Sequence, residues 1–190
     1  GAQQDALFLH GNMASNRWWL PLLSHMPRGE TTSRAICAEW RGCGTSGAPK
    51  SEAELKPDNM ARDMLALLEN LTAKKDKVTI VGHSTGGIVG VFMALLQPEK
   101  ISKLVLIDSV GPMGVNFEPD FLKLFDTMRV DKAVCTQVLM STVHGVDTAT
   151  PYYARLADDA FGMGEHNWRG VLNGLMGLDL REQLKRITCP

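Results

Sequence analysis

A serine flanked by glycines, in the run Gly82-His83-Ser84-Thr85-Gly86, constrains this chain more than any other feature. The four residues before the run, Val78 to Val81, are apolar or β-branched and predict a buried strand. Apolar residues follow at helical spacing, namely Ile88, Val91, Phe92, Leu95 and Leu96. Pro98 ends that predicted helix. A strand, a sharp turn and a helix with a serine at the turn predict a nucleophile elbow; the alternative is a plain Ser/Gly-rich turn at a helix start.

Composition and charge fit a single α/β domain. The chain has 190 residues, of which 44% are hydrophobic and 22% charged, and its formal net charge is −1. No apolar run approaches the roughly 20 residues that span a bilayer, and no signal-peptide pattern opens the sequence. We therefore predict a cytoplasmic protein with no membrane partner. The near-neutral charge, without a basic stripe, also argues against nucleic acid as a partner.

Metal and cofactor motifs are absent from the sequence. The four cysteines lack C-x-x-C spacing, which predicts reduced and mostly buried thiols. The histidines and acidic residues show no H-E-x-x-H pattern, so we predict neither a metal nor a cofactor. The glycine-rich run Arg41-Gly42-Cys43-Gly44 does not match the G-x-G-x-x-G nucleotide loop.

Strand-like and helix-like runs alternate through the first part of the chain. Strands are predicted over Ala6 to His10, Ser33 to Ala38, Val78 to Val81 and Ile101 to Asp108. Helices are predicted around Trp18 to Leu23, over Met60 to Leu71 and after Ser84. This alternation predicts an α/β fold whose parallel sheet carries helices on both faces.

Beyond Pro112 the pattern changes to helices only. Phe117, Phe121 and Phe125 share one predicted face, and further helical patterns cover about 149–161 and 165–177. The methionines of this insertion are candidates to line an apolar substrate pocket, namely Met128, Met140, Met163 and Met176. Of these, Met140 and Met163 are predicted as substrate-binding residues. Ordinary packing in a core is the alternative for each of them.

Four stretches in order carry a resemblance to the α/β-hydrolase superfamily. They are His10-Gly11-Asn12, Glu39-Trp40-Arg41-Gly42-Cys43-Gly44-Thr45-Ser46, Val81 to Gly87, and Leu104 to Asp108. The second departs from the family pattern, with Glu39 where aspartate is usual and Cys43 where histidine is frequent. The resemblance implies an α/β-hydrolase core over 1–112, a helical lid over 113–178, and a return helix over 179–190.

The resemblance also implies roles for individual residues. Ser84 would be the nucleophile, and the backbone N–H groups of Asn12 and Thr85 would form the oxyanion hole. Asp108 stands where some members carry the catalytic acid. Its alternative role is to orient the loop that follows.

No histidine stands where the family carries its catalytic base, so we expect little or no turnover from this chain alone. Ile187 to Pro190 resembles the residues that lead into the acid-bearing strand, so the chain resembles an internal fragment without the first two and last two strands. Family order would place the four strands as second, first, third, fourth. Both outer strands would then have unpaired edges, from which we expect a homodimer.

Two functions remain open at this point. The first is a serine hydrolase that acts on carboxylic esters of small, mostly apolar substrates through an acyl-enzyme; thioester hydrolysis, perhydrolysis and C–C cleavage are related chemistries. The second is a catalytically incomplete module that binds a small apolar ligand. A histidine that approaches Ser84 would distinguish the first function from the second.

Overall fold

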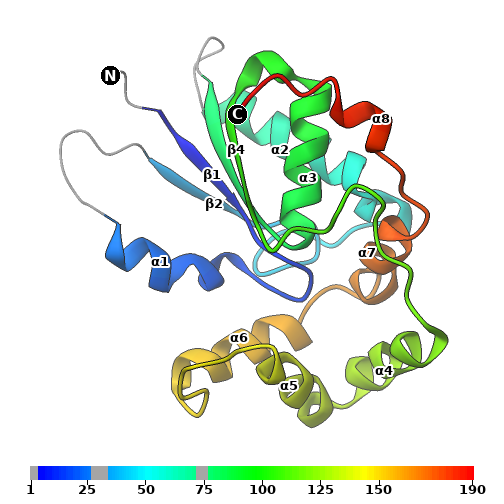
Figure 1. The fold of residues 1–190 in the computed structure, drawn as a ribbon. Helices are drawn as coiled ribbons and strands as arrows, with labels where there is room; N and C mark the ends of the chain where they lie inside the picture. Colours follow the sequence, from blue (N-terminus) through cyan, green and yellow to red (C-terminus); the bar gives the residue numbers. More distant parts are fainter. Residues whose placement is uncertain (1–3, 27–33, 72–76) are drawn as a thin grey trace.

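Four parallel strands form the centre of the computed structural model, which describes residues 4–26, 34–71 and 77–190 (Figure 1). They are β1 (Ala6–Leu9), β2 (Ala35–Ala38), β3 (Val78–His83) and β4 (Ile101–Ile107), in the order β2-β1-β3-β4. The predicted α/β fold and the predicted strand order are both confirmed. Ser33, the predicted start of the second strand, lies outside the described residues.

Two strands end earlier than predicted. β1 ends at Leu9, so His10 already belongs to the loop that follows. β4 ends at Ile107 because Asp108 has a φ of 43°, which no extended strand accommodates. Both strands end at the edge of the sheet where the parallel strands finish. In each case the polar residue that follows, His10 or Asp108, lies outside the strand.

One face of the sheet is covered by α2 (Pro57–Leu71) and α3 (Thr85–Leu96). Leu7 and Leu9 of β1 pack into the core on this face together with Met60 and Met93 of the two helices. Residues that alternate with them point the other way, since side chains alternate along a strand. This apolar layer fixes α3 behind β3, and therefore fixes the turn between them.

The opposite face carries less cover. Phe8 contacts Trp19 at a ring-centroid distance of 5.2 Å, which places η1 (Asn16–Trp19) on this side, and α1 (Leu20–His25) continues from it. Val105, Leu106 and Ile107 of β4 are 40–47% exposed. Helices therefore lie on both faces, as predicted, but the cover is thick on one face only.

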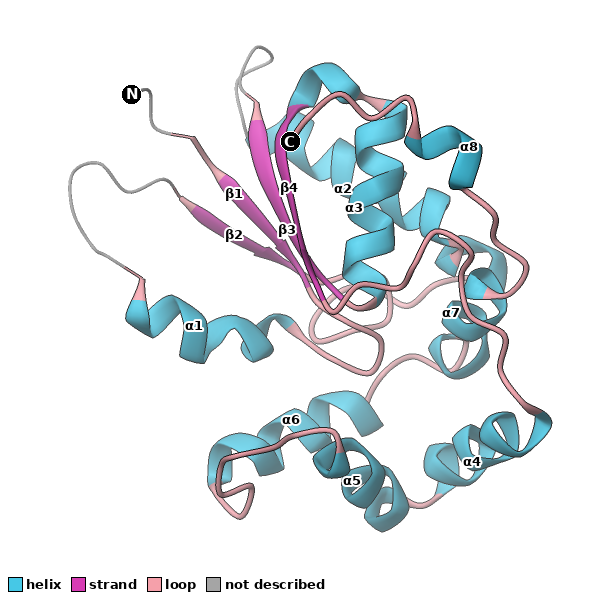
Figure 2. Cartoon of the chain, in the orientation of Figure 1, coloured by secondary structure: helices cyan, strands magenta, loops and turns pink. Residues whose placement is uncertain are grey.

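All the secondary-structure elements that the structure describes after Pro112 are helices, as predicted (Figure 2). These helices are α4 (Pro119–Val130), α5 (Lys132–Ser141), α6 (Pro151–Phe161), α7 (Asn167–Leu175) and α8 (Arg181–Leu184). α4 begins after Phe117, and α6 begins at Pro151 instead of near 149, because proline favours the first position of a helix. Residues 113–178 are called the helical segment below.

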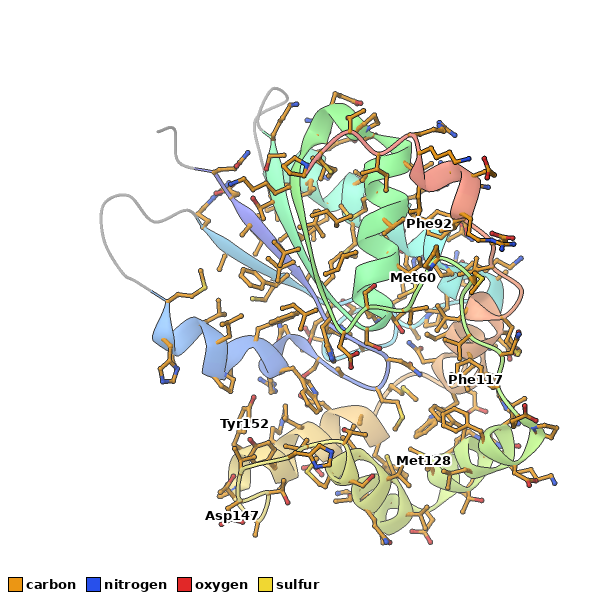
Figure 3. The ribbon with its side chains drawn as sticks, in the orientation of Figure 1. Met60, Phe92, Phe117, Met128, Asp147 and Tyr152 are labelled. Atoms are coloured by element: carbon orange, nitrogen blue, oxygen red, sulfur yellow. The ribbon has the colours of Figure 1, made fainter. Side chains whose placement is uncertain are left out.

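The helical segment has its own apolar core and lies beyond the carboxyl ends of the strands (Figures 2 and 3). Phe125, Met128, Leu139 and Trp168 belong to this core, which also includes Met13 from the loop after β1. α7 also packs against the sheet layer, through Val171 and Leu175 beside Ile88 of α3. Helix η2 (Glu52–Leu55) lies under α7, and η3 (Pro98–Lys100) joins α3 to β4.

All four cysteines are free thiols. Cys43 and Cys135 are buried, whereas Cys37 and Cys189 are partly exposed, so burial as predicted holds for two of them. Burial raises the pKa of Cys43 to about 12, with a smaller contribution from the nearby Glu39 carboxylate. The Cys43 thiol is therefore protonated and unreactive at neutral pH, and the side chain serves only to fill the core.

Candidate active site

Ser84 sits at the junction of β3 and α3 in a strained backbone conformation, with φ 51° and ψ −118°. Its N–H donates to the carbonyl of Ile107 at 3.1 Å. Its own carbonyl accepts from the N–H groups of Gly87 at 3.0 Å and Val110 at 3.1 Å. These three bonds hold the strained residue from both β4 and α3.

Two glycines make the sharp turn sterically feasible. A Cβ on Gly82 would lie 2.5 Å from the carbonyl oxygen of Gly86, and a Cβ on Gly86 would lie 2.6 Å from that of His10. Real Cβ atoms do not approach oxygen so closely. The strand, the helix and the loop after β1 can therefore meet around Ser84 only because both positions lack a side chain.

A cavity of about 460 Å³ opens between this turn and the helical segment. Its polar lining consists of Asn12, His83, Ser84, Thr85, Asp108 and Thr142. The remaining lining is aliphatic, aromatic or thioether, with Phe117, Phe121, Phe125, Met13 and Met128 among it. The described chain has three non-glycine residues with positive φ, Met13, Ser84 and Asp108, and all three line this cavity. Strain concentrated in one cavity is typical of a functional site.

The loop after β1 lies directly against Ser84. A Cβ on Gly11 would lie 3.2 Å from the Cβ of Ser84, so the backbone of this loop passes beside the Ser84 side chain. His10 is fully buried; its Nδ1 donates to the carbonyl of Gly11 at 2.8 Å, and its ring lies 4.0 Å from that of Trp40. Burial lowers the pKa of His10 to about 4, although the bond to Gly11 opposes this shift. A neutral His10 thus shapes the loop that brings Asn12 into the cavity.

His83 and Asp108 also line the cavity side by side, because His83 pairs with Ile107 in the sheet and Asp108 directly follows it. Burial lowers the pKa of His83, and the charge of Asp108 opposes that shift. All five histidines lie within the described residues, and His83 alone is found in the cavity lining. The site thus combines a strained serine, an imidazole and a carboxylate.

The two predicted substrate-binding methionines lie elsewhere. Met140 lines a separate hollow of about 380 Å³ between α5 and the start of α6, and Met163 is buried beside Trp168 in the core of the helical segment. Met128, also a candidate from the sequence, does line the cavity, and so does Met13, which was not predicted. Met128 continues the helical spacing of Phe121 and Phe125, a signal that the sequence offered; Met13 follows no periodic pattern.

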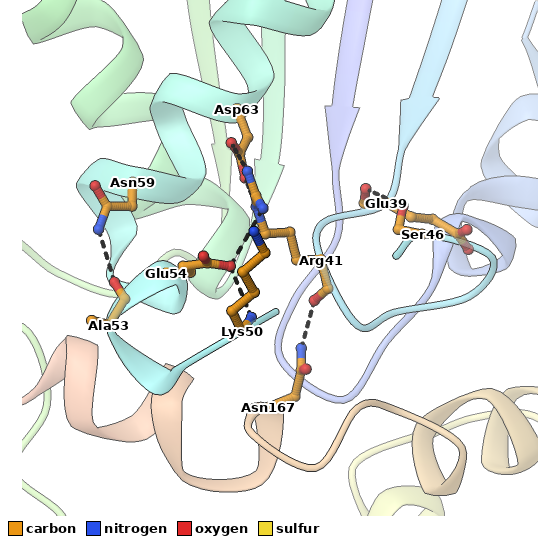
Figure 4. A network of polar contacts seen from close by, with 9 residues as sticks. All are labelled: Glu39, Arg41, Ser46, Lys50, Ala53, Glu54, Asn59, Asp63 and Asn167. Atoms are coloured by element: carbon orange, nitrogen blue, oxygen red, sulfur yellow. Dashed lines mark hydrogen bonds and ion pairs between the residues drawn. The ribbon is translucent and has the colours of Figure 1, made fainter. Parts of the chain in front are cut away.

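The glycine-rich loop after β2 supports the site without lining the cavity. The Glu39 carboxylate accepts from the N–H of Thr45 at 3.0 Å and of Asn16 at 3.4 Å. Arg41 pairs with Asp63 and with Glu54, and these carboxylates raise its pKa above the ordinary value (Figure 4). Glutamate at position 39 therefore joins this loop to the start of η1.

The described residues contain no group of three His, Cys, Asp or Glu side chains that could hold a metal ion. Within the same part of the chain, no helix is long and apolar enough to cross a bilayer.

A strained serine at a strand–helix turn, beside a cavity at the carboxyl ends of a parallel sheet, defines a class of hydrolase folds. Residues 7–158 match the family model described as "alpha/beta hydrolase fold", so the chain belongs to that family.

Similar proteins include hydrolases from several bacteria. The chain is 27% identical to a putative carbamate hydrolase RutD of Variovorax paradoxus, covering 100% of this chain and 72% of that protein. It is 31% identical to a putative carbamate hydrolase RutD of Pseudomonas savastanoi, covering 76% of this chain and 59% of that protein. The solved structure of the esterase EaEST of Exiguobacterium antarcticum superposes with a TM-score of 0.82 at 22% identity, covering 100% of this chain and 72% of that structure. The last likeness shows the fold alone.

Proposed function

We propose that this chain forms the core of a serine hydrolase that acts on carboxylic esters of small, mostly apolar substrates. The observation that carries the proposal is the position of Ser84, which stands strained between β3 and α3 in the wall of the cavity. The hydroxyl would attack the ester carbonyl, the alcohol would leave, and water would then hydrolyse the acyl-enzyme. Residues 1–112 would form the first part of the hydrolase core, residues 113–178 its lid, and residues 179–190 a return helix.

Two backbone N–H groups are suited to stabilise the tetrahedral intermediate. Thr85 is the first residue of α3, where helix N–H groups have no partner within the helix and the helix dipole favours negative charge. Asn12 lies opposite, on the loop that packs against the Cβ of Ser84. We propose that these two groups form the oxyanion hole.

Asp108 is our candidate for the acid of the site. It leaves β4 with positive φ, lines the cavity and interacts electrostatically with His83. Its carboxylate could orient an imidazole that approaches Ser84, which is the role of the acid in a catalytic triad. His83 itself directly precedes the serine, and we assign it no role as the base.

The lining of the cavity supports an apolar substrate. Phe117 stacks on Phe121 at 5.1 Å with nearly parallel rings, and Phe121 contacts Phe125 at the same distance. No lysine or arginine lines the cavity among the described residues, so a negatively charged acyl group would find no counter-ion. A short alkyl or aryl ester suits both the volume and the lining.

The test is hydrolysis of p-nitrophenyl butyrate by the chain, by its Ser84→Ala variant and by Ser141→Ala, which removes an exposed hydroxyl on α5. We expect little turnover from this chain, since none of its histidines is assigned the role of base. The turnover that remains should be lost with Ser84→Ala and kept with Ser141→Ala, and mass spectrometry should find the butyryl group on Ser84. Background rates in all three proteins would contradict catalysis by this chain. Binding of the ester without turnover would then favour the ligand-binding module.

A further inference from the structure

A carboxylate in the helical segment binds two side chains of the loop that follows β1. Asp159 of α6 has a side chain only 8% exposed, and its Oδ2 accepts from the Ser15 hydroxyl at 2.7 Å. The same oxygen lies 2.9 Å from Nε of Arg17. Arg155, one turn earlier on α6, approaches the other oxygen at 3.3 Å. The two partners in the loop are Ser15 and Arg17, and they follow Asn12 by three and five positions.

Other contacts fix the same loop to the helical segment. The Tyr152 hydroxyl, also on α6, donates to the carbonyl of Arg17 at 2.8 Å. Met13 is buried in the core of the helical segment beside Phe125 and has a φ of 57°. A non-glycine residue keeps such a conformation only when its surroundings impose it. The loop is thus held on both sides of Asn12, by β1 before it and by the helical segment after it.

The Ser15 hydroxyl links the Asp159 carboxylate to the backbone of the loop. Ser15 is fully buried, and its hydroxyl donates to Asp159. The same oxygen accepts from the N–H of Arg17 at 3.3 Å and so caps the start of η1. A hydroxyl that donates and accepts in this way has a fixed orientation. Loss of the carboxylate would leave a buried hydroxyl and a guanidinium without their partner, and the loop would relax.

We propose that Asp159 is a positioning residue for the oxyanion hole. Its carboxylate holds the loop from Asn12 to Arg17 so that the backbone N–H of Asn12 faces the oxygen that becomes negative at Ser84. The helical segment then does more than cover the substrate, since one of its helices completes the geometry for the transition state. This inference rests on the proposed role of Ser84 and Asn12.

The test compares two ketones of the same shape. Phenethyl trifluoromethyl ketone adds a serine hydroxyl and forms a tetrahedral hemiketal whose oxygen occupies an oxyanion hole. Phenethyl methyl ketone only fills the cavity. The ratio of their dissociation constants, measured by tryptophan fluorescence, reports the hole separately from the cavity. The proteins compared are the unmodified chain, Asp159→Asn, Ser15→Ala and the control Asp158→Asn, whose carboxylate pairs with Lys132 on the surface.

We expect Asp159→Asn and Ser15→Ala to weaken binding of the trifluoromethyl ketone at least about tenfold while binding of the methyl ketone changes less than about twofold. Asp158→Asn should change neither. A variant that carries both Asp159→Asn and Ser15→Ala should lose little more affinity for the trifluoromethyl ketone than either single variant, since both substitutions act through one contact.

Equal weakening of both ketones would show a role in building the cavity and would overturn the inference, as would unchanged binding of both. A separate result would overturn the proposed function itself: an unmodified chain that shows no preference for the trifluoromethyl ketone and no loss of affinity with Ser84→Ala.

Discussion

Asn167 donates from its Nδ2 to the carbonyl oxygen of Arg41 at 2.8 Å, across 126 positions of sequence (Figure 4). A backbone bond lies beside it, from the N–H of Gly164 to the carbonyl of Gly42 at 2.7 Å. The asparagine is buried at the start of α7. These bonds join the helical segment to the glycine-rich loop, so the segment is seated on the core at a defined point.

Removal of the Asn167 side chain should therefore destabilise the fold. We expect Asn167→Ala to lower the free energy of unfolding by about 1–3 kcal/mol, because the carbonyl of Arg41 would lose its partner in a buried place. Asn173→Ala is the matched control, since Asn173 lies on the exposed face of the same helix and bonds to Glu52 at the surface. Urea unfolding measures both; equal losses in the two variants would contradict a special role for Asn167.

The turn at Ser84 should not tolerate a methyl group at Gly86. A Cβ there meets the backbone of Leu9 and His10, which cannot move aside, so Gly86→Ala should cost more than about 3 kcal/mol or prevent folding. Gly47→Ala is the control, because no atom lies within 4 Å of a Cβ at Gly47. Thermal unfolding followed by circular dichroism compares the two. If Gly86→Ala were as stable as Gly47→Ala, the backbone of Leu9 and His10 could not lie as close to Gly86 as described.

Protonation of His10 should link stability to pH. Its pKa is about 4 in the folded chain against 6.5 ordinarily, so between these values the unfolded state binds the extra proton. Stability is then complete above about pH 6.5 and falls as the pH drops toward 4, by about 3 kcal/mol at most.

The measurement is the urea midpoint at pH 7, 5.5 and 4.5 for the unmodified chain and for His10→Phe, which keeps a ring against Trp40. The variant should be less stable at pH 7 but should lose less stability on acidification. His144→Gln, at an exposed position, should keep the full pH dependence. An equal pH dependence in His10→Phe would refute the assignment.

The outer edge of β4 should promote self-association. Val105 to Ile107 are 40–47% exposed, and exposed apolar strands pair with other chains. One bond already occupies part of this edge, from the N–H of Leu104 to the carbonyl of Pro190 at 2.9 Å. We propose a dimer through β4, which sedimentation equilibrium or size exclusion would detect. Val105→Lys should weaken it, whereas Val130→Lys, at a 73% exposed position of α4, should not. A monomer at all concentrations would contradict the proposal.

Local patterns predicted much of the fold and part of the candidate site. The apolar run before Ser84 and the helical spacing after it gave β3 and α3, because both periodicities are written in neighbouring residues. The glycine spacing around Ser84 predicted the sharp turn for a steric reason that the structure makes explicit. The choice of Met140 and Met163 had no such basis, since helical spacing says which residues share a face but not which neighbour that face meets.

The sequence by itself thus determined the strand, the turn, the helix and the serine between them, since these depend on residues a few positions apart. Only the tertiary structure decided which side chains surround that serine. Asp159 meets Ser15 across 144 positions, and Met13 enters the core of the helical segment. Contacts of this kind depend on how whole elements pack, because packing brings together residues whose spacing in the chain carries no signal.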